Sequence, residues 1–98
     1  MSTIVDLIGV GAENAISRAE LAARAGMSDR QMRAAVAQAR ENGELILNTQ
    51  NGAGYFRATK DDLDAIERQY RQDTARALSI LKRRKAMRRL LKEAGRSV

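Results

Sequence analysis

Two helix-start signals lie eleven residues apart in this chain, with a glycine between them. The first is Ser17 followed three residues later by Glu20, and the second is Ser28 followed three residues later by Gln31. In this pattern the serine hydroxyl accepts a bond from a backbone amide of the first turn, and the later side chain reaches back to the amide of the serine. Gly26 ends the first segment. The spacing predicts two short helices joined by the tight turn "AGMS", a helix-turn-helix.

The hydrophobic pattern changes after Gly43, a glycine placed where a left-handed residue is needed to end the second of these helices. "ELILNTQ" and "GYFRA" are rich in residues that favour strands, and Asn51-Gly52 between them is a strong turn pair. We therefore predict a β-hairpin. Tyr55 and Phe56 are expected to lie in its core rather than to form a stacking platform.

A helix is predicted at each side of this central part. Residues 3–10 have four apolar side chains on one broad face, namely Ile4, Val5, Leu7 and Ile8. At the other side, Thr59 with Asp62 resembles a further cap, and nothing from there to Ala94 interrupts a helix. At about 1.5 Å per residue, such a helix is roughly 50 Å long. The predicted fold class is mainly α with a small β-hairpin.

Several functional classes are disfavoured by composition. The 98 residues include no cysteine and no histidine, so a disulfide framework, a thiolate metal site and the commonest general base are all missing. No apolar run approaches the roughly 20 residues that span a bilayer, and the N-terminus lacks the basic lead of a secretion signal. We expect a cytoplasmic protein that is not an enzyme, uses no cofactor or metal, and has no membrane partner.

Charge is distributed unevenly along the chain, whose formal net charge is +6. Residues 1–59 carry six arginines and six acidic residues, which gives zero net charge. Residues 60–73 have a net charge of −2, from three basic and five acidic side chains. Residues 74–98 have a net charge of +8, from nine basic side chains and Glu93. A basic segment of this density favours phosphate binding.

Four short motifs occur in order between residues 16 and 59: "SRAELA" from Ser17, "GMSDRQMR" from Gly26, "ARENG" from Ala39 and "GY" at Gly54. Together they resemble the winged helix-turn-helix of bacterial repressors of the biotin-repressor type, and of many small phage and prophage regulatory proteins. Two positions depart from that pattern. Arg57 stands where an apolar residue is usual, and the wing tip "QNGA" has no basic residue.

The resemblance implies a winged helix-turn-helix domain at residues 1–59, followed by a long basic helix at residues 60–98. It also implies that the helix after Ser28 enters the major groove of double-stranded DNA, where arginine binds guanine and glutamine binds adenine. Met32, Val36 and Ala39 share a narrow stripe and are expected in the core. The DNA-facing candidates of this helix are Ser28, Arg30, Gln31, Arg33, Ala34, Ala37 and Gln38. An alanine-rich solvated helix, or a winged helix that binds protein, would have a similar pattern.

Phosphate contacts are expected from outside that helix. The candidates are Arg57, Lys60, Lys82, Arg83, Arg84, Lys85, Arg88, Arg89 and Lys92. The basic residues near the C-terminus have two alternative roles. They can pair with the acidic residues 61–67 of a partner helix that runs antiparallel, or they simply suit the negative end of the helix dipole.

A heptad pattern runs along the same helix. Steps of three and four residues from Leu63 pass through Leu63, Ile66, Tyr70, Asp73, Ala77, Ile80, Arg84, Met87, Leu91 and Ala94. Eight of these ten residues are apolar, which is typical of a seam that packs on another helix. We therefore predict a homodimer through the C-terminal helix.

The sequence thus predicts a dimeric DNA-binding regulatory protein, acting in transcription or phage replication control in a bacterial or phage-infected cell. The alternative is a non-catalytic adaptor or phage-encoded inhibitor that uses the winged helix and the C-terminal helix to bind a protein partner.

Overall fold

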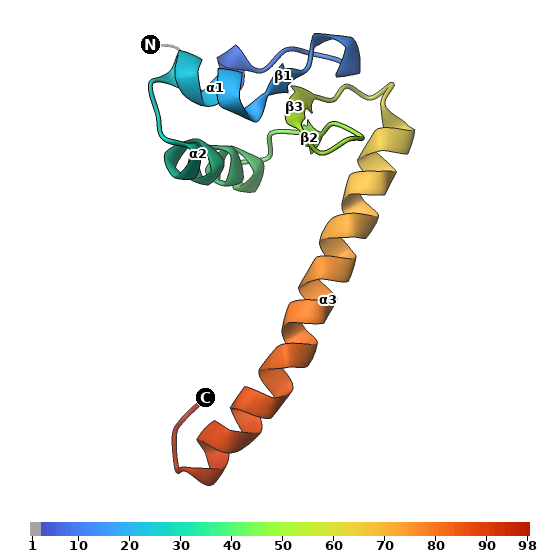
Figure 1. Ribbon diagram of the computed structural model, residues 1–98. Helices are drawn as coiled ribbons and strands as arrows, with labels where there is room; N and C mark the ends of the chain where they lie inside the picture. Colours follow the sequence, from blue (N-terminus) through green and yellow to red (C-terminus); the bar gives the residue numbers. More distant parts are fainter. Residues whose placement is uncertain (1–2) are drawn as a thin grey trace. The chain divides into compact units, whose positions relative to one another are not determined.

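The computed structural model describes residues 3–98 of the chain, which form two compact units (Figure 1). The N-terminal unit ends at Ile66, and the C-terminal unit is Glu67–Val98. The elements are, in order, the 3-10 helices η1 (Val5–Leu7) and η2 (Ala12–Asn14), strand β1 (Ile16–Ser17), helices α1 (Arg18–Ala25) and α2 (Asp29–Glu41), strands β2 (Ile46–Asn48) and β3 (Gly54–Arg57), and helix α3 (Leu63–Glu93). The predicted fold class, mainly α with a small β-hairpin, is confirmed.

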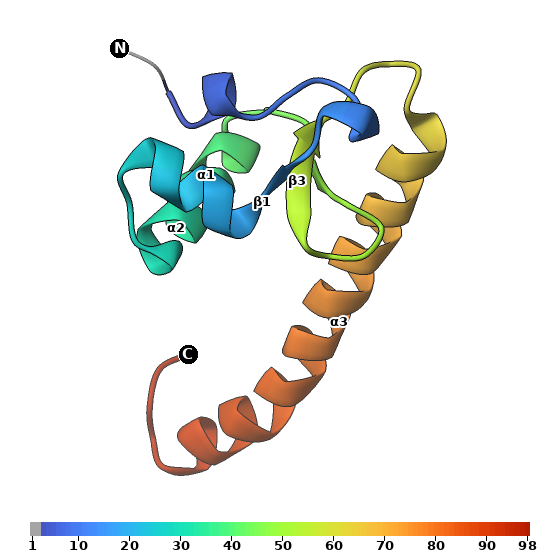
Figure 2. The ribbon, with the colours of Figure 1, turned by 45° about the horizontal axis from the view of Figure 1, so that its top comes forward.

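The hairpin is part of a three-stranded antiparallel sheet in the order β1-β3-β2. Figure 2 shows β1 and β3 side by side in this sheet. The hairpin itself was predicted, but the short strand β1, which places Ile16 opposite Tyr55, was not. Gly54 lies opposite Ser17 in this pairing. A Cβ atom on Gly54 would lie 2.2 Å from the carbonyl oxygen of Ile16, so only glycine permits so close an approach of the two strands.

The core lies between the sheet and the two helices α1 and α2. Its largest fully buried side chains are Ile8, Leu21, Met32, Val36 and Ile46. Tyr55 and Phe56 are also buried, as predicted from the sequence. Because successive side chains of a strand point to opposite faces, the burial of both neighbours means that β3 is covered on both faces.

The predicted helix at residues 3–10 is wrong. Only Val5–Leu7 is helical, as a single 3-10 turn, and Ile8 is already extended. The segment beyond it pairs with β3: the Arg57 amide donates to Gly9 at 2.8 Å, and the Gly11 amide donates to Arg57 at 2.9 Å. The apolar residues keep the expected role, since Ile8 is fully buried. Hydrogen bonds to a distant strand therefore override the local helical pattern.

The helix-turn-helix region follows the predicted capping. The Ser17 hydroxyl accepts from the Glu20 amide, and at α2 both bonds of the Ser28–Gln31 box are present. One bond differs, because the Glu20 carboxylate binds Arg24 at 2.6 Å instead of reaching back to Ser17. Gly43 has a φ of 96° and ends α2 as predicted.

The hairpin loop is longer than a two-residue turn, because β2 ends at Asn48 and β3 begins at Gly54. Of the predicted turn pair, only Gly52 has positive φ, at 73°. Asn51 acts through its side chain, whose oxygen accepts from the Thr49 hydroxyl at 2.7 Å and from the Ala53 amide at 3.0 Å. An Asx-type bond of this kind fixes a turn without a left-handed asparagine.

Helix α3 begins at Leu63, later than the Thr59 cap predicts, because Thr59 and Asp62 bond to each other across a turn before it. The Thr59 amide donates to the Asp62 carboxylate at 2.8 Å. The helix then continues without a break for 31 residues, about 46 Å at 1.5 Å per residue. None of its residues is buried.

Candidate nucleic-acid interface

Helix α2 has an outward face made of small and charged side chains. Counted at about 100° per residue, Arg30, Ala34, Ala37 and Glu41 lie opposite the buried stripe of Met32, Val36 and Ala39. The four outward residues are all exposed, in agreement with the expected exposure of the first three. The sequence interpretation overlooked Glu41, whose carboxylate lies on the same face and would repel phosphate. Helical spacing alone would have located it.

Arg30 differs from the other basic residues of this helix, Arg33 and Arg40, because among residues 3–98 it has no hydrogen-bond or ion-pair partner. Arg33 binds Asp29 at 2.8 Å. The Gln31 side-chain oxygen accepts from the Ser28 amide at 3.0 Å, and the amide group of Gln38 donates weakly to Asn42 at 3.5 Å. Arg30 is thus the basic side chain of α2 most available for an anionic or hydrogen-bonding ligand.

Two other arginines of the N-terminal unit hold the hairpin. Arg18 donates to the Gly52 carbonyl at 2.9 Å, and Arg40 donates to the Ile46 carbonyl at 2.8 Å. Both guanidinium groups also lie near the Tyr55 ring, 5.9 Å and 5.5 Å from its centroid. The sequence interpretation missed these roles, since their partners are backbone carbonyls that only the tertiary fold brings close.

Arg57 was expected to contact phosphate, and the structure places it in a structural position. The residue is half-buried, and its Nε donates to the Ile8 carbonyl at 2.7 Å. Together with the backbone bonds to Gly9 and Gly11, this bond fixes the N-terminal segment to β3. Arg57 therefore holds two segments of the N-terminal unit together through hydrogen bonds, which a phosphate contact would not require.

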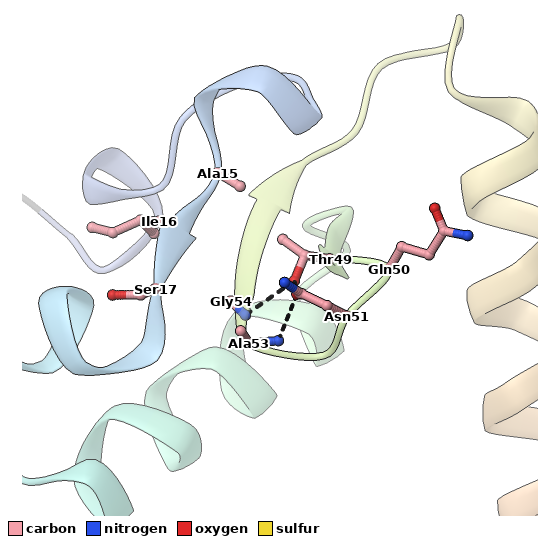
Figure 3. Close-up of a pocket in the computed structure, with 8 residues that line it drawn as sticks. All are labelled: Ala15, Ile16, Ser17, Thr49, Gln50, Asn51, Ala53 and Gly54. Carbon is pink, nitrogen blue, oxygen red and sulfur yellow. Dashed lines mark hydrogen bonds between the residues drawn. The ribbon is translucent and has the colours of Figure 1, made fainter.

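A shallow pocket lies between the hairpin loop and β1 (Figure 3). Its lining is uncharged. The Ser17 hydroxyl is used to cap α1, and the Thr49 and Asn51 side chains are used within the loop. The Thr49 hydroxyl accepts from the Gly54 amide at 3.1 Å, while the Asn51 oxygen accepts from Thr49 and Ala53. The pocket therefore presents no charged group to a ligand, and the tip of the hairpin loop, residues 50–53, has no lysine or arginine.

The basic residues of the C-terminal helix are all exposed. We use the term basic tail for residues 74–98. The ion pairs found among residues 3–98 are Glu20–Arg24, Asp29–Arg33 and Glu67–Arg71, and none involves the basic tail. Lys60, in the turn before α3, is also exposed. The exposed candidates in the tail are Lys82, Arg83, Arg84, Lys85, Arg88, Arg89 and Lys92.

Within residues 3–98, no cluster of acidic side chains could hold a metal ion, and no helix is long and apolar enough to cross a membrane. Comparison of the chain with protein-family models, with curated proteins and with solved structures found no match.

Proposed function

We propose that this protein is a winged helix-turn-helix regulator that binds double-stranded DNA without catalysis. In this proposal α2 enters the major groove, and the basic tail contacts phosphates. The observation that carries the proposal is the tail: nine basic side chains between Arg76 and Arg96 are exposed, with no ion-pair partner among the described residues. Each such cation that neutralises a phosphate releases condensed counterions, which favours binding to any sequence.

The N-terminal unit supports base contacts better than phosphate contacts. Up to Ile66 it has seven basic and nine acidic side chains, a net charge of −2, whereas the C-terminal unit has eleven and three, a net charge of +8. Most arginines of the N-terminal unit also bind protein groups. A unit with a net charge of −2 adds no overall attraction to DNA. We therefore assign the sequence-independent part of the affinity to the C-terminal unit.

The outward face of α2 supports the proposed groove contact. Ala34 and Ala37 are exposed and small, which lets the helix approach base edges closely, and their methyl groups suit the methyl of thymine. Arg30 is exposed on the same face without a protein partner, so its guanidinium is available to bind guanine O6 and N7. The preceding helix α1 packs on α2 through the buried Leu21 and Ala22.

The proposal is tested by titrating duplex DNA at several salt concentrations. The test variant carries Lys85→Gln and Arg89→Gln, two tail residues without carboxylate partners. Its plot of log affinity against log salt should be flatter than that of the native chain by about 0.9 for each phosphate that the variant no longer neutralises.

The matched control carries Arg24→Gln and Arg71→Gln, which remove the same charge from residues already paired with carboxylates. Its slope should stay close to that of the native chain. Equal slopes for the native chain and both variants would exclude phosphate contacts from Lys85 and Arg89. No DNA binding by the native chain at low salt would reject the proposed function.

A further inference from the structure

Helix α3 exposes a mainly apolar stripe along its length. Leu63, Tyr70, Ile80, Met87 and Leu91 are between 40% and 70% exposed. They belong to a seam of alternating three- and four-residue steps that extends over more than four heptads, from Leu63 to Ala94. A pattern sustained over three to four heptads is typical of a helix that packs against another helix.

Two charged residues interrupt this seam, and their signs are opposite. Asp73 lies near its middle and accepts a bond from Gln69 at 2.9 Å. Arg84 lies eleven residues further on and has no partner among residues 3–98. A charge within a packed seam is costly unless an opposite charge faces it, so these two residues restrict which partner and which register are acceptable.

We infer that α3 pairs with α3 of a second copy in antiparallel orientation, in the register that places Asp73 of each copy opposite Arg84 of the other. In an antiparallel coiled coil, the two seam positions of the heptad face each other. With the ends of the seam aligned, the layers are Leu63 with Ala94, Ile66 with Leu91, Tyr70 with Met87, Asp73 with Arg84, and Ala77 with Ile80. Every layer that contains a small residue also contains a large one, and the acid meets the base.

A parallel pair in register instead pairs each seam residue with itself, so like charges and small residues face each other. It places Asp73 against Asp73, Arg84 against Arg84, and each of Ala77 and Ala94 against itself, which leaves two like-charge layers and two underfilled layers. It also brings two tails of net charge +8 together, whereas the antiparallel pair places each tail beside the acidic first turns of the other helix. Charge complementarity thus selects a second copy of this chain, running antiparallel.

The positions that flank the seam contribute little to this choice. In the inferred register they include one attractive contact, Glu67 with Arg88, and one repulsive contact, Arg76 with Arg83. Exposed pairs of this kind are weak, and Glu67 already binds Arg71 at 2.8 Å. The residues used to test DNA binding, Lys85 and Arg89, lie outside the seam and its flanks. The inference therefore does not depend on the proposed function, and the two can fail separately.

A charge exchange tests orientation directly by sedimentation equilibrium. Asp73→Arg alone creates two Arg–Arg layers in the antiparallel pair, and Arg84→Asp alone creates two Asp–Asp layers. Each should weaken self-association by roughly tenfold or more. The double variant Asp73→Arg with Arg84→Asp has the native net charge and restores both layers, so its self-association should return to the native level. In a parallel pair neither single change alters the number of like-charge layers, and the double change rescues nothing.

The absence of cysteine from the sequence allows a second test. Two single-cysteine variants, Tyr70→Cys and Met87→Cys, are mixed in a thiol–disulfide redox buffer. The disulfide-linked dimers are then identified by mass spectrometry. The antiparallel register predicts that the mixed disulfide, which joins position 70 of one variant to position 87 of the other, dominates. Dominant homodisulfides, or a native chain that sediments as a monomer throughout the titration range, would overturn the inference.

Discussion

Arginine side chains in the N-terminal unit serve mainly to hold its parts together. Arg18, Arg40 and Arg57 donate to backbone carbonyls of segments distant in sequence or beyond a turn. Arg24 and Arg33 bind carboxylates one helical turn away. Arg30 alone is left without a partner among residues 3–98, which is why the proposed base contact centres on it.

Arg57 should matter for stability and not for DNA affinity. Arg57→Met removes the donor to the carbonyl of the buried Ile8 and should lower the free energy of unfolding by about 1 to 3 kcal/mol. The matched control Arg24→Met removes an exposed ion pair and should cost below about 1 kcal/mol. Urea denaturation measures both. An effect no larger than that of the control would show that the bond to Ile8 contributes nothing to stability.

Arg30 should matter for base preference. Arg30→Ala should weaken binding to the preferred DNA sequence by about 1 to 3 kcal/mol and relax preference at one base pair. Arg30→Lys keeps the charge but loses the two-pronged contact with guanine, so it should recover part of the affinity and little of the preference. Selection from random duplexes followed by titration measures both quantities. Unchanged preference in the two variants would remove Arg30 from the proposed readout.

The pairing of strand β1 with β3 depends on a close backbone approach at Gly54, which faces the Ile16 carbonyl. Gly54→Ala should destabilise the protein far more than Gly52→Ala. The added Cβ at Gly54 collides with the Ile16 carbonyl, whereas at Gly52 it meets nothing within 4 Å and costs only the left-handed strain of about 1 to 2 kcal/mol. Thermal unfolding of the two variants gives the comparison. Equal losses would mean that β1 can move away from β3 without cost.

The sequence predicted those elements whose signals are local. The capped starts at Ser17 and Ser28, the end at Gly43 and the hairpin all depend on residues a few positions apart. Strand β1 was missed because two residues are too short to show alternation, and its partner Tyr55 is 39 positions away. The helix predicted at residues 3–10 was wrong for the same reason, since bonds to Arg57 decide that segment. In the candidate site, exposure of α2 was predictable from helical spacing, but the carbonyl partners of the arginines were not.

At the scale of the whole molecule, the buried core and the exposed seam belong to different parts of the chain. Every buried residue of the core precedes residue 60, and α3 contributes none. The inferred dimer should therefore separate without unfolding of the N-terminal unit.

Ile80→Asp tests this separation, because Ile80 lies in the seam. The variant should be monomeric in sedimentation, while hydrogen exchange of α1, α2 and the sheet stays at the native level. Leu78→Asp is the matched control: Leu78 is comparably exposed, at 55% against 42%, but lies off the seam. That control should remain dimeric. Equal loss of association in both variants would place the interface on another face of α3, and loss of exchange protection in α1 or α2 would show that the units are coupled.

The hairpin loop has a consequence for the entropy of any complex it enters. Loops of this kind are usually mobile and lose conformational freedom when they bind. Here Arg18 donates to the Gly52 carbonyl, and the Asn51 side-chain oxygen accepts from Thr49 and Ala53. The Thr49 hydroxyl also accepts from the Gly54 amide. The loop is thus already ordered before a ligand arrives, and its ordering cost was met during folding. Because the loop is uncharged and already fixed, a partner that bound it would be recognised by its shape. Binding would then cost the loop little conformational entropy.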